Sequence, residues 1–170
     1  LVDIEAKYPE LITPDSPSQR VAGAPLPEFR KIPHKVPQWS FNDAFSEEDV
    51  KAFDERVKKM LRGTLGAFVT PSYLCELKID GLKIVLEYEK GILKSAATRG
   101  DGRMGEDVTQ NVRTIESVPL VLTEPVDIIV EGEVWMAKSD FESLNERQKS
   151  AGLPLYANPR NVTAGSIRQL

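Results

Sequence analysis

Residues 72–107 read SYLCELKIDGLKIVLEYEKGILKSAATRGDGRMGED, and this stretch decides the fold of the chain. A strand-like run ends in the Lys-Ile-Asp-Gly sequence at 78–81. Because strand side chains alternate between two faces, its polar residues share one face and its apolar residues take the core side. The polar residues are Glu76, Lys78 and Asp80, and the apolar residues are Cys75, Leu77 and Ile79.

A hairpin follows this run. We predict a strand over 82–89, a two-residue turn at Lys90-Gly91 and a returning strand over 92–99. This pairing sets Glu89 opposite Ile92 and brings Arg99 back beside the Lys-Ile-Asp-Gly turn. A one-residue slip would change the face of Arg99 but not its neighbourhood. Lys90 is not the Asn or Gly that such turns prefer, so the turn type stays open.

Lys78 is a candidate nucleophile at the mouth of a nucleotide pocket. An amine attacks phosphorus only when it is neutral. Leu77, Ile79 and Arg99 would favour the neutral form by excluding water or by repulsion, whereas nearby carboxylates oppose it. Arg99 and Mg²⁺ would supply cations to the phosphate. A Lys-x-Asp-Gly pattern occurs by chance in roughly a few per cent of such chains, so a surface lysine before a turn is the alternative.

The composition is that of a globular protein, with 170 residues, 41% hydrophobic and 28% charged. The net charge of −4 means that any nucleic-acid contact must be local. A single cysteine, Cys75, fits a cytoplasmic protein. The only histidine, His34, is predicted to be a packing or surface residue rather than a metal ligand. No apolar run approaches the roughly 20 residues of a membrane span.

Residues 1–37 contain seven prolines, which predicts an extended lead-in segment with a short helical turn in the first ten residues. A plain linker is the alternative. We assign residues 38–170 to one domain. Ser46 and the acidic residues after it predict a helix over 47–62, ending near Gly63. Its apolar stripe is predicted to pack in the core: Val50, Phe53, Val57, Met60 and Leu61.

The remaining chain alternates strands and helices. We expect a short helix at 108–115, strands at 119–122 and 127–135, a helix from 139 to about 151 capped by Gly152, and a turn or helix entry at 158–161. Glu131 and Glu133 share one strand face. The predicted fold class is α+β, with mostly antiparallel sheets and flanking helices. The last residues read as a helix cut mid-course, which together with Leu1 suggests a fragment.

Six stretches then point to one family: YPELITPDSPSQRV (8–21), CELKIDGL (75–82), ATRGDG (97–102), GEDVTQNVRTI (105–115), GEVWM (132–136) and ANPRNVTAGSIRQL (157–170). The chain closely resembles the nucleotidyltransferase (adenylation) domain of bacterial NAD⁺-dependent DNA ligases. The stretches cover most of the chain and are more specific together than Lys-x-Asp-Gly, which ATP-dependent ligases and capping enzymes share. The resemblance implies an incomplete nucleotidyltransferase fold.

The resemblance also implies a mechanism. Lys78 would attack the adenylyl phosphorus of NAD⁺, hold AMP as a phosphoramidate and pass it to the 5′-phosphate of a DNA nick. The implied catalytic residues are Lys78 and Asp80, the latter supporting the lysine and Mg²⁺. The other roles are adenine reading by Glu76, ribose or phosphate contact by Arg99, ribose contact by Glu133, a pocket rim of Ser40 and Phe41, and DNA or nicotinamide-side phosphate contact by Arg160 and Arg168.

Several positions depart from the family pattern. Ser40-Phe41-Asn42-Asp43 replaces Ser-Leu-Asp-Asn, Lys83 replaces a small residue, Glu131 replaces an arginine, and residues 102–105 replace Gly-Thr-Thr-Gly. The family's nicotinamide-recognising helices would precede Tyr8 and further pocket residues would follow Leu170, so we expect a monomeric fragment that does not seal nicks alone. An ATP-using nucleotidyltransferase and a non-catalytic nucleotide- or DNA-binding module are the alternatives.

Overall fold

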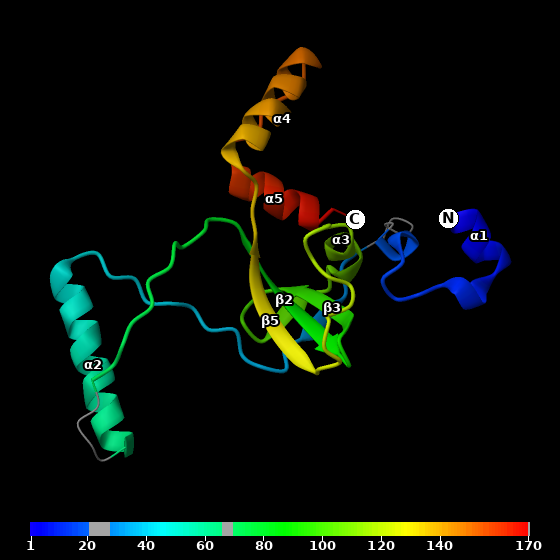
Figure 1. Cartoon of the computed structure of the whole chain (residues 1–170). Helices are drawn as coiled ribbons and strands as arrows, with labels where there is room; N and C mark the ends of the chain where they lie inside the picture. Colours follow the sequence, from blue (N-terminus) through cyan, green and yellow to red (C-terminus); the bar gives the residue numbers. More distant parts are fainter. Residues whose placement is uncertain (21–27, 66–69, 170) are drawn as a thin grey trace. The chain divides into compact units, whose positions relative to one another are not determined.

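A computed structural model describes residues 1–20, 28–65 and 70–169 of the chain (Figure 1). The chain divides into two units. The first unit comprises Leu1–Gln38 and Ile79–Leu170, and the second comprises Trp39–Lys78. The part of the predicted lead-in that falls on residues 21–27 lies outside the described residues. None of the described helices combines the length and apolar composition that a membrane span requires.

An antiparallel three-stranded sheet forms the centre of the first unit. Strand β2 (Leu82–Glu89) lies between β3 (Ile92–Thr98) and β5 (Ile128–Val134). One face of β2 contributes Ile84, Leu86 and Tyr88 to the hydrophobic core. The other buried core residues are Leu93, Ala96, Val108, Val112, Val118, Leu120 and Ile167. The predicted α+β class with mostly antiparallel sheets is therefore confirmed.

The hairpin turn is of type I′. Lys90 has a φ of 51° and Gly91 a φ of 77°, and two positive φ values match the right-handed twist of the flanking strands. The predicted pairing of Glu89 with Ile92 is confirmed.

Farther from the turn, the predicted register is wrong by one residue. The register shifts between Glu87 and Tyr88, so Glu87 pairs with Ser95 and Ile84 pairs with Thr98. The cause is a β-bulge, which places an extra residue, Lys94, in one strand. Strand β3 accordingly ends at Thr98, and Arg99 follows it.

The end of the predicted lead-in forms a second small sheet. Strand β1 (Lys31–Pro33) pairs antiparallel with β4 (Met104–Glu106). The N–H of His34 donates to the Arg103 carbonyl and the N–H of Gln38 to the Gly102 carbonyl, both at 2.8 Å. The His34 ring lies with Nε2 3.1 Å from the Arg99 carbonyl oxygen, which confirms a packing position. The earlier lead-in contains α1 (Val2–Lys7) and the short 3₁₀ helices η1 (Pro9–Leu11) and η2 (Pro17–Arg20).

Three further helices belong to this unit: α3 (Thr109–Arg113), α4 (Lys138–Ser150) and α5 (Pro159–Ile167). Gly152, with a φ of 68°, ends α4 as predicted, because the N–H groups of residues 152 and 153 reach back to the carbonyls of Lys149 and Gln148. The predicted helix entry is confirmed at Asn158, whose Oδ1 accepts from the Asn161 N–H at 2.8 Å. Residues 119–122 contribute only a bridge between Val121 and Ile92.

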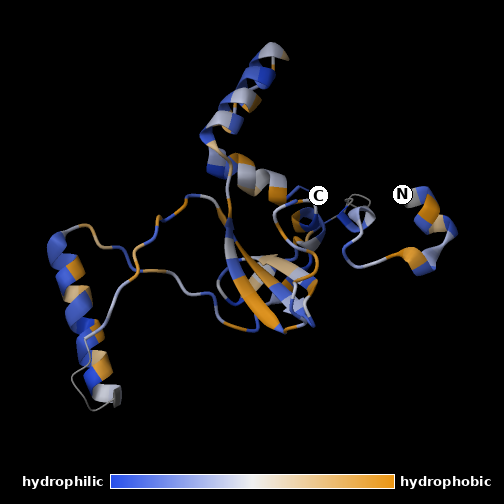
Figure 2. Ribbon diagram, in the orientation of Figure 1, coloured by the Kyte–Doolittle hydropathy of each residue, from blue (hydrophilic) through white to orange (hydrophobic). Residues whose placement is uncertain are grey.

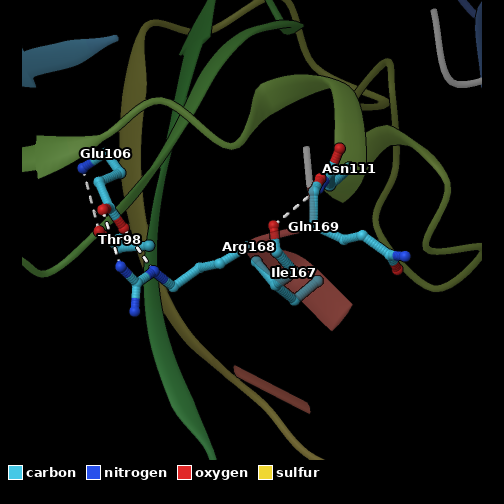
Figure 3. Close-up of polar contacts among 6 residues, drawn as sticks. All are labelled: Thr98, Glu106, Asn111, Ile167, Arg168 and Gln169. Atoms are coloured by element: carbon cyan, nitrogen blue, oxygen red, sulfur yellow. Dashed lines mark hydrogen bonds and ion pairs between the residues drawn. The ribbon is translucent and has the colours of Figure 1, made fainter. Parts of the chain in front are cut away.

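The helical continuation predicted for the last residues is wrong, since α5 ends at Ile167. Asn111 stabilises this end. Its Nδ2 donates to the Ile167 carbonyl at 2.8 Å and to the Gln169 carbonyl at 2.7 Å (Figure 3). These side-chain bonds satisfy carbonyls that a longer helix would have bonded itself.

The second unit contains helix α2 (Glu47–Leu65). Ser46 caps it as predicted: its Oγ accepts from the Asp49 N–H, while Asp49 Oδ2 accepts from the Ser46 N–H, both at 3.1 Å. The helix ends at Leu65, two residues after the Gly63 near which the end was predicted. A glycine does not stop a helix whose following residues keep its hydrogen bonds.

The apolar stripe of α2 does not form the predicted core. Val50 is 56% exposed and Met60 71% exposed. The ring of Phe53 contacts that of Tyr73, with centroids 5.9 Å apart. Figure 2 shows apolar residues concentrated in the central strands of the first unit, whereas along α2 they alternate with polar ones. Helical periodicity marks a face that is able to pack but does not supply the surface against which it packs.

The strand predicted to end at Lys78 is also absent from the described residues. The segment 70–80 has no regular structure, and Leu77 on its predicted core side is 90% exposed. A strand needs a neighbour to satisfy its N–H and C=O groups, and within the described ranges this segment pairs with none.

Candidate functional site

An open hollow of about 470 Å³ lies in the first unit, between the central sheet, the β1–β4 sheet and helix α5. Five of the side chains along it are cationic and two are acidic. Its lining residues are Lys31, Leu82, Lys83, Thr98, Arg99, Gly100, Asp101, Met104, Gly105, Glu106, Arg160 and Arg168. The excess of cations makes the hollow a candidate site for an anionic ligand such as phosphate.

Arg168 is held at the wall of the hollow by Glu106 (Figure 3). Its Nε donates to Oε2 at 2.6 Å and its Nη2 to Oε1 at 2.9 Å, a two-point geometry that fixes the plane of the guanidinium. The hydrogen bonds with Glu106 raise the pKa of Arg168 above its usual value. Glu106 is itself held, because its backbone N–H donates to Thr98 Oγ1 at 3.0 Å. The sequence predicted Arg168 as a site residue but missed Glu106.

The structure brings together two other predicted site residues, Asp80 and Arg160. Nη1 of Arg160 donates to Asp80 Oδ1 at 3.0 Å. Both side chains are well exposed, at 62% and 75%, so the pair stabilises the fold little. The next residue shows why this turn needs glycine: a Cβ on Gly81 would lie 2.2 Å from the Val134 carbonyl oxygen of β5. Gly81 thus lets the chain carrying Asp80 pass directly against the sheet.

Lys83 lies on the central strand and was not predicted as a site residue. It pairs across the sheet with Glu133, a predicted ribose-binding residue. Its Nζ lies 2.7 Å from Glu131 Oε2. Opposite residues in an antiparallel pair share a face, so these three charged side chains occupy one face beside the hollow. The alternation of side chains along the strand would have placed Lys83 on this face only if the pairing of β2 with β5 had been known from the sequence.

A glycine-containing loop closes another wall. The Asp101 carboxylate accepts the backbone N–H groups of Arg103 at 2.8 Å and Met104 at 2.7 Å. These bonds, that from Met104 first, hold the pKa of Asp101 below its usual value. Gly100 and Gly102 have φ values of 56° and 91°, which a side chain would strain. The loop therefore presents a fixed backbone to the hollow.

The other predicted site residues lie in the second unit. Ser40, Phe41, Glu76 and Lys78 are exposed and lie outside helix α2, with Phe41 85% exposed. Leu77, predicted to shield Lys78 from water, is 90% exposed, so that prediction is wrong for this structure. The roles of these residues stay predictions.

No group of three His, Cys, Asp or Glu side chains that could hold a metal ion occurs within the described ranges. A magnesium ion bound to nucleotide phosphates often takes only one or two protein carboxylates. The exposed carboxylate of Asp80, which is bonded to Arg160 at the edge of the hollow, could serve as such a metal ligand.

Comparisons with known proteins agree with the sequence motifs. Residues 26–170 match the NAD-dependent DNA ligase adenylation domain, and residues 1–22 match the DNA ligase-like, N-terminal NAD⁺-binding domain. The chain is 52% identical over 170 residues to a DNA ligase of Shouchella clausii and 51% identical over 170 residues to one of Anoxybacillus flavithermus. It is also 51% identical over 171 residues to a DNA ligase of Carboxydothermus hydrogenoformans.

Each of these alignments covers the whole chain but only 24% or 25% of the relative. The chain thus spans about a quarter of the length of the curated relatives it matches. The family match covers the segments that hold both the hollow and the Lys-Ile-Asp-Gly turn. This chain therefore belongs to the NAD-dependent DNA ligase family, and its residues 26–170 belong to the adenylation domain of that family.

Proposed function

We propose that the chain carries out the adenylation chemistry of an NAD⁺-dependent DNA ligase. The neutral amine of Lys78 attacks the adenylyl phosphorus of NAD⁺, nicotinamide mononucleotide leaves, and AMP stays on the lysine through a P–N bond. AMP then passes to the 5′-phosphate of a nick in double-stranded DNA, and the 3′-hydroxyl displaces it to form the phosphodiester.

One observation carries this proposal. Five cationic side chains line the hollow against two acidic ones, and one of its lining residues, Leu82, follows Lys78 by four positions in the sequence. Phosphoryl chemistry depends on fixed positive charge around the phosphate more than on covalent participation by the protein. Arg168 is an example of such a fixed charge, because two of its guanidinium N–H groups donate to Glu106.

The remaining roles follow from position. Arg99 would contact ribose or phosphate, Glu133 the ribose hydroxyls and Glu76 the adenine, with Ser40 and Phe41 at the rim. Arg160 and Arg168 would contact DNA or the nicotinamide-side phosphate. When bound, Mg²⁺ would neutralise phosphate charge, and Asp80 is the residue that would hold it.

We also propose the setting in which this chemistry takes place. The partners are NAD⁺ and nicked DNA, and the protein is a cytoplasmic monomer. The 170-residue chain alone does not seal nicks, because it spans only about a quarter of the length of the DNA ligases it matches. Nick sealing by the purified chain would contradict this point.

Intact-mass spectrometry tests the proposal. A ligase chain that includes this segment is incubated with Mg²⁺ and either NAD⁺ or ATP, alongside its Lys78→Ala variant and a matched control, Lys59→Ala, which removes an exposed lysine of the same unit. We expect one adenylyl adduct from NAD⁺ in a ligase chain that includes this segment, retained in the control and lost in Lys78→Ala. An adduct that persists without Lys78 would refute it, and an adduct from ATP alone would favour an ATP-using nucleotidyltransferase.

A further inference from the structure

We propose that Lys83 is a further binding residue for the diphosphate of the nucleotide, held at the wall of the hollow by Glu131. This inference rests on the proposed function and adds a cation to its phosphate site. It comes from the observed register, since Lys83 belongs to no motif on which the functional prediction was built.

The position of Lys83 suits this role. It sits on the central strand of the sheet, its side chain is 22% exposed, and it lines the hollow together with Arg99 and Arg160. Its Cα lies opposite that of Glu133, which places the ammonium stem on the face where ribose contact is proposed. The backbone of a central strand is held by hydrogen bonds on both sides, so the ammonium group of Lys83 is confined to a limited region near the hollow.

Glu131 bonds the lysine but does not itself line the hollow. The ion pair is 2.7 Å long, yet Glu131 is 48% exposed and is not one of the lining residues. The two acidic residues that do line the hollow are already engaged, Glu106 by Arg168 and Asp101 by backbone N–H groups. Both carboxylates that line the hollow are therefore already bonded when a diphosphate enters.

A purely structural ion pair is the competing explanation, and it predicts a different mutational pattern. If the ion pair only stabilises the packing of β2 against β5, removing either partner changes ligand binding by the same factor. If Lys83 binds phosphate, removing the lysine removes the binding charge, whereas removing the glutamate charge leaves the ammonium in the hollow. Comparing Lys83→Gln with Glu131→Gln separates these cases, because both variants break the same ion pair.

The experiment is a calorimetric titration of the 170-residue chain with sodium pyrophosphate and, separately, with NAD⁺. We expect Lys83→Gln to raise the Kd for both ligands by ~10-fold, the loss of one charged hydrogen bond, and Glu131→Gln to change it by less than ~3-fold. Lys83→Arg keeps the charge and should restore most of the binding. Lys83→Met, which retains the apolar stem, replaces Lys83→Gln if the latter does not fold.

Equal effects of Lys83→Gln and Glu131→Gln would overturn the inference, as would the absence of pyrophosphate binding by the unaltered chain. Failure of the proposed function has a different signature. In that case a ligase chain containing this segment forms no Lys78 adduct, while the Lys83 variants still differ in pyrophosphate binding. The two proposals are thus decided by separate measurements.

Discussion

Replacing Lys90 by asparagine should stabilise the first unit. Lys90 has a φ of 51°, and a left-handed conformation costs an ordinary L-residue roughly 1–2 kcal/mol. Asparagine adopts it more readily, because its short side chain bonds to the local backbone. The backbone N–H of Lys90 donates to Asp127 Oδ1 at 2.6 Å, and the substitution keeps that group.

We therefore expect Lys90→Asn to raise the free energy of unfolding by ~0.5–1 kcal/mol, because asparagine relieves part of the energy that the left-handed backbone conformation costs lysine. At this chain length such a change corresponds to a rise of ~1–4 °C in Tm. Asparagine is preferred to glycine here, since glycine would also lose more conformational entropy on folding.

Urea unfolding followed by circular dichroism measures the effect, as a shift in midpoint at constant slope. The matched control is Lys94→Asn, the same change in a strand, where the ion pair with Glu89 is lost and stability should fall slightly. Gly91→Ala should lower stability by more than ~1 kcal/mol, because φ is 77° and the new Cβ would lie 2.6 Å from the Glu124 carbonyl oxygen. Lys90→Asn having no effect, or the same effect as Lys94→Asn, would refute the strain argument.

Two further predictions concern the walls of the hollow. Glu106→Gln should free the Arg168 guanidinium, which NMR would show as averaging of the Arg168 Nε resonance, and it should lower the free energy of unfolding by only ~0.5–1 kcal/mol because the Arg168 side chain is 52% exposed. The control is Glu116→Gln, which alters an exposed glutamate elsewhere in the chain. An Arg168 resonance that does not change in Glu106→Gln would contradict the role of Glu106. The N–H groups of Met104 and Arg103 hold the pKa of Asp101 below its unfolded value, so its contribution to stability is present above the unfolded pKa and is lost as pH falls through the folded pKa. A carboxyl ¹³C titration should place the Asp101 midpoint below that of a peptide aspartate, Asp101→Asn should weaken the acid-side loss of stability, and a midpoint at or above the peptide value would disprove the assignment.

Local signals in the sequence predicted much of the fold. Alternating side chains and Lys90-Gly91 located β2 and its turn, while Ser46, Gly152 and Asn158 marked helix ends. Each depends on groups within a few residues of one another, which is why the sequence reveals them. The bulge at Lys94, by contrast, reflects how two strands fit together over their whole length.

The candidate site divides in the same way. The motifs identified the family and named Asp80, Arg99, Arg160 and Arg168, three of which line one hollow, with Asp80 bonded to Arg160. The sequence did not reveal that Lys83 faces that hollow or that Glu106 fixes Arg168.

The sequence by itself determined the residue types, the caps and turns, and membership of the NAD-dependent DNA ligase family. Only the tertiary structure decided that Glu106 meets Arg168 across 62 residues of chain and that Lys83 lies opposite Glu133. The physical reason is the range of the interactions. Caps and turns are set by bonds between near neighbours, whereas register, burial and charge pairing depend on which distant segments come together, and a one-residue shift reverses the face of every side chain.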